Sequence, residues 1–175
     1  MQNKSRINLT PRQVIEMLGL EPLPEEGGFY RETFRSDLQL SRECLPQVYT
    51  DSRSAYTCIY YLVTPESFSA LHRLPADEIW HFYLGDPLEQ LQLFPGGRGK
   101  IILLGQDLEN NEHPQVCVPA GVWQGTRLKD GGRYALVGTT MAPGFEFADF
   151  EAAEEQDILL TYSAMKDEIR KYFHT

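Results

Sequence analysis

The sequence of 175 residues contains only 3 cysteines, and their positions give no pairing pattern. Cys44, Cys58 and Cys117 are odd in number and none belongs to a C-x-x-C pair, which excludes a disulfide framework. Residues 1–10 lack the apolar core of a signal peptide, and no apolar run reaches the roughly 20 residues that a membrane span requires. We therefore expect a soluble, cytoplasmic protein.

Positive charge is also scarce. The chain has 16 basic residues against 25 acidic ones, and its formal net charge is −9. The Lys and Arg residues are scattered, so no basic cluster is available to follow a phosphate backbone or an anionic lipid surface. This composition excludes nucleic acid and membrane as partners, and solubility is a sufficient reason for the acidity.

The length fits one folded domain with short appendages. A chain of this size buries roughly two thirds of its unfolded surface, and 42% of the residues are hydrophobic. Thr10 can cap a helix that starts at Pro11, Gln13 completes a capping box, and Gly19 suits the helix end. We expect a single domain over residues 1–175, with a helix over 11–19, a barrel core over about 28–148 and a helical tail over about 150–173.

The central part of the chain has the pattern of β structure. Short runs rich in β-branched and aromatic residues alternate with turn signals such as Asn110-Asn111 and Asp130-Gly131-Gly132. This spacing is typical of an antiparallel sandwich or barrel. The predicted strands span residues 29–34, 56–64, 68–73, 78–84, 88–94, 100–104, 115–118, 122–128 and 133–141.

Residues 69–85 resemble the first sequence motif of the cupins. That motif begins with His-x-His, continues to a Glu and closes on a Gly, and His72, Glu78 and Gly85 stand at three of these positions. Residues 119–124 resemble the second motif, Pro-x-Gly-x-x-His. The resemblance implies an all-β fold, the cupin double-stranded β-helix or jelly-roll barrel, with a short N-terminal helix and a C-terminal helical tail.

Two positions depart from the metal-binding pattern of that family. Typical metal-binding cupins supply three histidines and one glutamate, a set that suits a divalent transition metal. This sequence has Leu74 at the second His position and Gln124 at the His position of the second motif. Because leucine cannot ligate a metal and glutamine is a poor neutral donor, we expect no cofactor. A divalent metal, if one binds, would use His72, Glu78 and Gln124.

A resemblance to one cupin group covers nearly the whole chain, from about residue 8 to residue 163. The segments 26–33, 59–62, 72–73, 78–81, 118–124 and 142–145 occur in the order found in that group, which is known as a domain of unknown function. The resemblance implies a jelly roll that usually forms a homodimer and has no established reaction.

Strand alternation assigns the candidate pocket residues to faces. Glu78, Trp80 and Phe82 share one face, and His81 faces the other way. If Glu78 points into the barrel, as the resemblance implies, aromatic walls surround a few polar groups there, which is usual for a small-molecule site. Tyr30, Arg31 and Glu32 can reach either the pocket mouth or a dimer seam. The ligand-binding candidates are His72, Glu78, Trp80, Phe82, Trp123, Gln124, Tyr30 and Arg31.

These residues lead to one hypothesis and two alternatives. The hypothesis is a cupin-fold protein that binds a small polar or sugar-like molecule in the barrel interior. The first alternative is a metal-independent sugar or nucleotide-sugar epimerase or isomerase, in which His72, oriented by Glu78, is the base and either Tyr60 or Tyr134 is the acid. The second is a metal-dependent cupin enzyme. A hydrogen-bonded core pair without any ligand is the plain structural explanation of His72 and Glu78.

Overall fold

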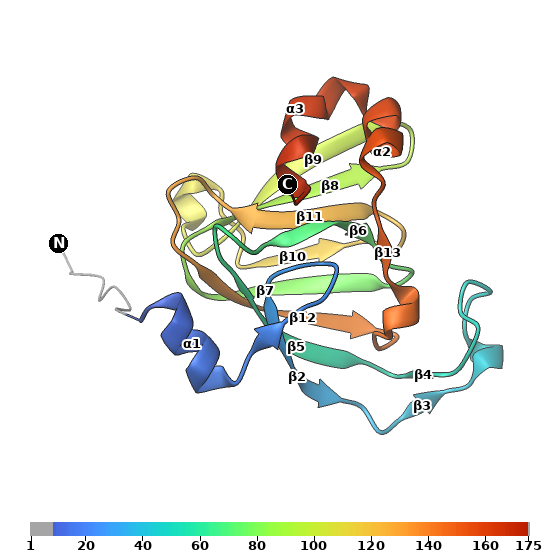
Figure 1. The fold of residues 1–175 in the computed structure, drawn as a ribbon. Helices are drawn as coiled ribbons and strands as arrows, with labels where there is room; N and C mark the ends of the chain where they lie inside the picture. Colours follow the sequence, from blue (N-terminus) through green and yellow to red (C-terminus); the bar gives the residue numbers. More distant parts are fainter. Residues whose placement is uncertain (1–8, 175) are drawn as a thin grey trace.

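The computed structural model describes residues 9–174 and contains two antiparallel β-sheets (Figure 1). The larger sheet has, in order, β1 (Glu21–Pro22), β2 (Phe29–Arg35), β5 (Thr57–Val63), β12 (Ala135–Ala142), β7 (Asp77–Gly85) and β10 (Gln115–Val118). The smaller sheet has β13 (Glu151–Ala152), β6 (Ser69–Arg73), β11 (Trp123–Leu128), β8 (Leu88–Phe94) and β9 (Arg98–Leu104). A separate pair is formed by β3 (Gln39–Leu40) and β4 (Arg53–Ser54). Residues 1–8, where we expect no signal-peptide core, lie outside the described part.

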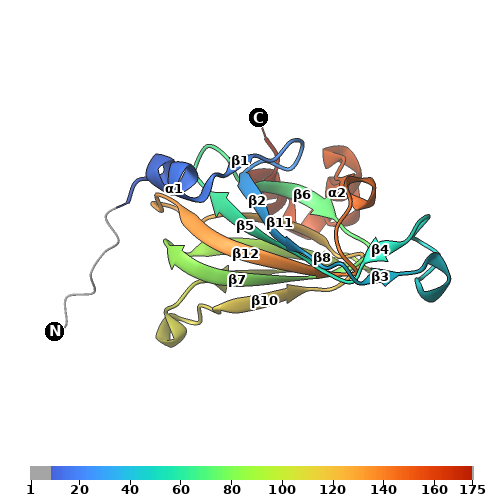
Figure 2. The ribbon, with the colours of Figure 1, turned by 90° about the horizontal axis from the view of Figure 1, so that it is seen from below.

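The two sheets face each other across one apolar core (Figure 2). Residues alternate along β7, so that Glu78, Trp80 and Phe82 are buried, whereas His81 is half-buried and Tyr83 is exposed. Alternation requires this arrangement because successive strand residues point to opposite faces of a sheet. The inner faces of both sheets therefore supply the barrel interior, and the outer face of the larger sheet carries His81 and Tyr83.

The predicted N-terminal helix is α1 (Pro11–Leu18), and its predicted caps are present. The backbone N–H of Gln13 donates to the Thr10 hydroxyl at 3.3 Å, and the Thr10 N–H donates to the Gln13 side chain at 2.9 Å. Gly19 ends the helix with φ 60°, a conformation that glycine adopts without strain. Val14 then packs the helix onto the sheet beside Leu62.

The predicted C-terminal helical tail is also confirmed. Both α2 (Glu155–Thr161) and α3 (Lys166–Ile169) lie beside β8 and β9 at the top of Figure 1. Ile158 and Ile169 pack against Leu91 and Leu93 on the outer face of the smaller sheet. None of the helices within residues 9–174 is long and apolar enough to cross a membrane.

The predicted fold class is confirmed, and each predicted strand is present. The bounds of β8 and β10 are the predicted ones, and the others differ by one or two residues at an end. The sequence analysis missed β1, β13 and the β3–β4 pair, each of which is only 2 residues long. So short a strand shows no alternation, and its pairing depends on tertiary contacts. All 3 cysteines are free, in agreement with the absence of a disulfide framework.

Candidate functional site

One end of the barrel interior holds a cavity of about 190 Å³. Its wall is formed by β2, β5, β7 and β12, by the segment before β2, and by the segment after β12. Apolar side chains such as Leu23, Ile59 and Met141 alternate in this wall with polar ones. The charged lining residues are Glu26, Glu32, Arg35, Glu78 and Glu146.

Glu78 is the most buried carboxylate in this wall and has a built hydrogen-bond environment. Its side chain is 6% exposed. Its Oε2 accepts a hydrogen bond from Gln124 Nε2 at 2.7 Å and another from Trp80 Nε1 at 3.1 Å. The same indole N–H lies 3.2 Å from Gln124 Oε1. Three of the predicted residues, from β7 and β11, therefore form one hydrogen-bonded cluster.

His72 lies next to this cluster, on β6. It is directly opposite Gln124 in the β6–β11 pairing and is 1% exposed. The Nδ1 atom of His72 lies 2.8 Å from the carbonyl oxygen of Ala70, so Nδ1 carries a proton and donates it to that oxygen. The ring stacks on Phe150 with centroids 5.2 Å apart. His72 is not one of the residues that line the 190 Å³ cavity.

Burial is the main influence on the pKa of Glu78 and raises it above the ordinary value. The nearby Glu26 carboxylate raises this pKa further, because two negative charges in one enclosed space repel. The charge of His72 and the hydrogen bonds from Thr139 and Gln124 act in the opposite direction. The net effect is that Glu78 holds its proton at a higher pH than an exposed glutamate does.

The residues around Glu78 do not fit the metal set that the cupin resemblance implies. Two N–H donors, from Gln124 and Trp80, face the carboxylate oxygen that would otherwise ligate a cation. Leu74, at the second His position, is a buried apolar residue in the cavity wall. Within residues 9–174 no group of three or more His, Cys, Asp or Glu side chains is placed to hold a metal ion. Hydrogen bonds from Gln124 and Trp80 orient the Glu78 carboxylate in this cluster.

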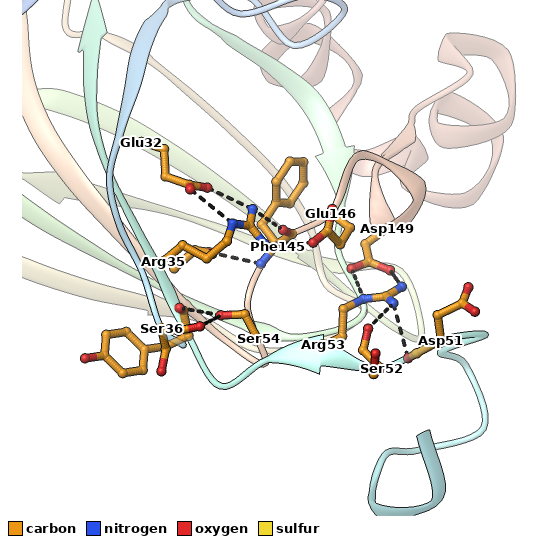
Figure 3. A network of polar contacts seen from close by, with 12 residues as sticks. Glu32, Arg35, Ser36, Asp51, Ser52, Arg53, Ser54, Phe145, Glu146 and Asp149 are labelled. Atoms are coloured by element: carbon orange, nitrogen blue, oxygen red, sulfur yellow. Dashed lines mark hydrogen bonds and ion pairs between the residues drawn. The ribbon is translucent and has the colours of Figure 1, made fainter. Parts of the chain in front are cut away.

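Two arginines hold the segment that follows β12 (Figure 3), and one of them, Arg35, lies at the mouth of the cavity. Arg35 donates to both carboxylate oxygens of Glu32 at 3.0 and 2.8 Å, to Glu146 at 2.7 Å and to the Phe145 carbonyl at 3.0 Å. The second arginine, Arg53 on β4, forms an ion pair with Asp149 through two hydrogen bonds of 3.0 and 2.7 Å. Only 4% of the Arg53 side chain and 6% of the Asp149 side chain are exposed. The segment after β12 is therefore held against β2 and β4.

The remaining aromatic candidates are distributed over three environments. Tyr30 lines the cavity, and Phe82 is buried in the apolar core further along the barrel. Trp123 is half-buried on the outer face of the smaller sheet, where the Arg73 guanidinium lies 4.6 Å from its ring centroid. Trp123 therefore does not share the barrel interior with its neighbour Gln124.

Three further candidates lie on the outer side of the larger sheet. The Arg31 guanidinium is 5.6 Å from the ring centroid of Tyr60, and Tyr60 in turn contacts Tyr83 edge to face at 6.1 Å. Tyr134 is 1% exposed and packs with Val14 of α1. Neither Tyr60 nor Tyr134 lines the cavity, so the structure does not bring either proposed acid to the substrate side of Glu78.

Three charged residues of the cavity wall, Glu26, Arg35 and Glu146, are not among the predicted site residues. The sequence predicts Glu32 at the pocket mouth or at a dimer seam, and Glu32 lines the cavity on the same strand face as Tyr30. Glu26 and Glu146 lie in irregular segments, where no periodicity indicates which way a side chain points. Arg35 meets Glu146 across 111 residues of sequence, a contact that only the fold determines.

A larger groove, of about 570 Å³, lies on the surface beside the turn between β11 and β12. Two of its basic residues have close acidic partners: Arg127 pairs with Glu89 at 2.6 Å and with Asp130 at 2.5 Å, and Lys171 pairs with Glu168 at 2.8 Å. These pairs are partly or fully exposed, so they resemble ordinary surface ion pairs. The smaller internal cavity, with its buried carboxylate, is the better candidate site.

The double-sheet barrel, with a polar cluster between β7 of one sheet and β11 of the other, defines a cupin jelly roll. The family described as "Cupin superfamily (DUF985)" matches residues 12–153, and the chain belongs to this family.

Several proteins resemble the chain over most of its length. An uncharacterized protein of Saccharomyces cerevisiae, YML079W, is 28% identical over 142 residues, which cover 77% of this chain and 71% of the yeast protein. A hypothetical protein from Leishmania major has a TM-score of 0.84 with 33% identity and covers 95% of this chain and 100% of its own. Protein SO0799 from Shewanella oneidensis has a TM-score of 0.82 with 34% identity and covers 94% of this chain and 97% of its own.

A more distant likeness concerns the fold alone. Oxalate decarboxylase from Bacillus subtilis has a TM-score of 0.52 with 15% identity, over 89% of this chain and 37% of the decarboxylase. At this level of identity the likeness supports the jelly-roll architecture and carries no information on the reaction.

Proposed function

We propose that this cupin binds a small polar molecule, of the size and polarity of a simple sugar, in the cavity beside Glu78. The supporting observation is the Glu78 carboxylate, which is 6% exposed yet lines an internal cavity. Burying a carboxylate is costly unless it is used, and two N–H donors hold this one in a fixed orientation. A mostly apolar wall with a few oriented polar groups is the usual composition of a small-molecule site.

The binding proposal is tested by native mass spectrometry of the full chain after incubation with a metabolite extract. We expect one small molecule to be retained by the wild type and lost from Glu78→Gln. Glu109→Gln, the same change at an exposed position far from the cavity, is the matched control and retains it. Binding that is equal in wild type and Glu78→Gln would place the ligand elsewhere.

A second candidate is metal-independent proton transfer on the bound molecule, as in a sugar isomerase or epimerase. It is favoured by one observation: burial raises the pKa of Glu78, which brings proton exchange by this carboxyl closer to neutral pH. In this version Glu78 exchanges the proton directly, and His72 acts indirectly, because its charge lowers the pKa of Glu78. Solvent deuterium incorporation into aldoses separates the roles. We expect it to be abolished in Glu78→Gln and reduced in His72→Ala.

We also propose that the chain forms a homodimer through the outer face of the larger sheet. Aromatic side chains are exposed there, with Tyr83 at 44%, Phe34 at 50% and Tyr56 at 40%. A second copy would cover this apolar surface in a symmetric way. Light scattering coupled to gel filtration tests the proposal: we expect a dimer for the wild type and a monomer for Tyr83→Glu.

The 3 free cysteines support a reducing, cytoplasmic location for this protein.

A further inference from the structure

The charged residues that line the cavity indicate the charge of its ligand. We propose, on the basis of the function proposed above, that the cavity selects a positively charged ligand, an amine or a quaternary ammonium compound, with Glu26 and Glu78 as its counter-charges. Four carboxylates and one guanidinium line the cavity, so its wall is acidic even after internal pairing.

The single guanidinium is not available to an anionic ligand. The Nε, Nη1 and Nη2 atoms of Arg35 all donate, to Glu32, to Glu146 and to the Phe145 carbonyl. A carboxylate or phosphate ligand would have to displace these bonds before Arg35 could bind it. It would also approach Glu26 and Glu78, and the wall has no cation besides Arg35 to offset their charge.

The carboxylates of Glu26 and Glu78 are held in place by hydrogen bonds from neighbouring side chains. Glu26 Oε1 accepts a hydrogen bond from Ser69 Oγ at 2.8 Å, and Glu78 Oε2 accepts from Gln124 and Trp80. Each is therefore held in place by neutral donors, which orient the carboxylate without neutralising its charge. Glu26 also opposes ionisation of Glu78 through its own charge, so the two carboxylates interact. A cation in the cavity would relieve this repulsion.

The rest of the wall suits an organic cation better than a hydrated inorganic one. Aromatic side chains at the mouth, Tyr30, Phe145 and Phe147, line the same cavity as the carboxylates. Aromatic faces attract ammonium groups that carry apolar substituents. A ligand with a charged nitrogen and a short carbon skeleton would therefore be bound at both ends.

The affinity for a cation should depend on pH, because Glu78 must lose its proton to act as a counter-charge. In the protonated state Glu78 is neutral, and a cation that binds to it displaces the carboxyl proton into solvent. Binding is therefore favoured by high pH, up to the pKa of Glu78, which burial raises above its ordinary value. A neutral ligand that accepts a hydrogen bond from the protonated carboxyl would show the reverse dependence.

The test is a titration of the full chain with probes matched in shape and different in charge. Choline is compared with its neutral carbon isostere dimethylbutanol, and glucosamine is compared with glucose and glucuronate. We expect the cation of either set to bind at least about tenfold more tightly than its neutral partner. We also expect choline affinity to rise as the pH rises through the raised pKa of Glu78, because the charge of choline does not titrate. Glu26→Gln and Glu78→Gln should each remove the preference, and Glu109→Gln should retain it.

The outcomes separate this inference from the proposed function. A neutral or anionic probe that binds as well as its cationic partner would overturn the charge selectivity and leave small-molecule binding intact. If no probe binds and the metabolite extract yields a neutral or anionic ligand that depends on Glu78, the inference is wrong and the proposed function stands. If the extract also yields nothing, both fail. Thermal unfolding of each variant confirms that it is folded.

Discussion

The two ends of the barrel interior are built from the same strands and differ in what those strands present. Along β12, Thr139 and Met141 line the cavity, whereas Ala135 and Val137, nearer the strand start, are fully buried in the apolar core. Along β7, Glu78 lines the cavity and Phe82 belongs to the apolar core. One strand pattern thus makes a closed core at one end and a site at the other. The substitutions that follow should affect the two ends differently.

The largest loss of stability is expected at the buried ion pair that joins β4 to the segment after β12. Asp149→Ala leaves the Arg53 guanidinium buried without its partner, and removal of one member of a buried pair costs about 3–5 kcal/mol. Urea unfolding measures this. Glu151→Ala, which removes the exposed pair with Arg73, is the matched control and should cost less than about 1 kcal/mol. Equal losses in the two variants would show that the buried pair does not fasten this segment.

A comparable but slightly smaller loss is expected at the closed end. Leu88 is fully buried in the core, and Leu88→Ala should destabilise the fold by about 2–5 kcal/mol through lost burial and the cavity left behind. Because this position is remote from Glu78, ligand binding at temperatures where the variant is folded should be unchanged. A loss of binding without a loss of stability would contradict the division between the two ends.

At the cavity end, unlike the closed end, the free energy of unfolding should depend on pH through Glu78. The pKa of Glu78 is raised in the folded protein, mainly by burial, so the folded state binds this proton more tightly than the unfolded state. The stabilising effect is fully present below the ordinary carboxyl pKa of 4.5 and is lost as pH rises through the folded-state pKa. We expect the free energy of unfolding of Glu78→Gln to fall less over this range than that of the wild type. Parallel curves for the two proteins would contradict the assignment.

The smallest effect is expected far from both ends. Thr10→Ala removes the N-terminal cap of α1 and should cost about 1 kcal/mol, measured by urea unfolding, with no effect on ligand binding. Thr10→Ser keeps the hydroxyl and serves as the control. A loss as large as that of Leu88→Ala would mean that α1 supports the barrel more strongly than its packing indicates.

The sequence was sufficient to predict the barrel and part of its interior. Alternation along residues 78–84 placed Glu78 and Trp80 on one inward face, and their hydrogen bond is present at 3.1 Å. Alternation does not say which inward residues meet a cavity. His72 points into the same interior and is packed between Ala70 and Phe150, whereas Tyr30 lines the cavity from another strand.

The mouth of the cavity could not be predicted, for a physical reason. Glu26 and Glu146 lie outside the long strands, in segments whose direction is set by contacts with residues distant in sequence. The position of Arg35 beside Glu146 depends on the pairing of β2, β5 and β12, which only the complete fold specifies. The local sequence pattern thus predicts which face of a strand a residue lies on, and the tertiary structure determines which of these residues line a cavity.

The most direct test of the account is a crystal structure of the full chain soaked with the molecule that native mass spectrometry recovers. The account predicts electron density for a small molecule within hydrogen-bond distance of the Glu78 carboxylate, inside the cavity that Tyr30 and Phe145 line. A cavity filled by repacked side chains, or a ligand bound on the surface with Glu78 enclosed by protein alone, would contradict it.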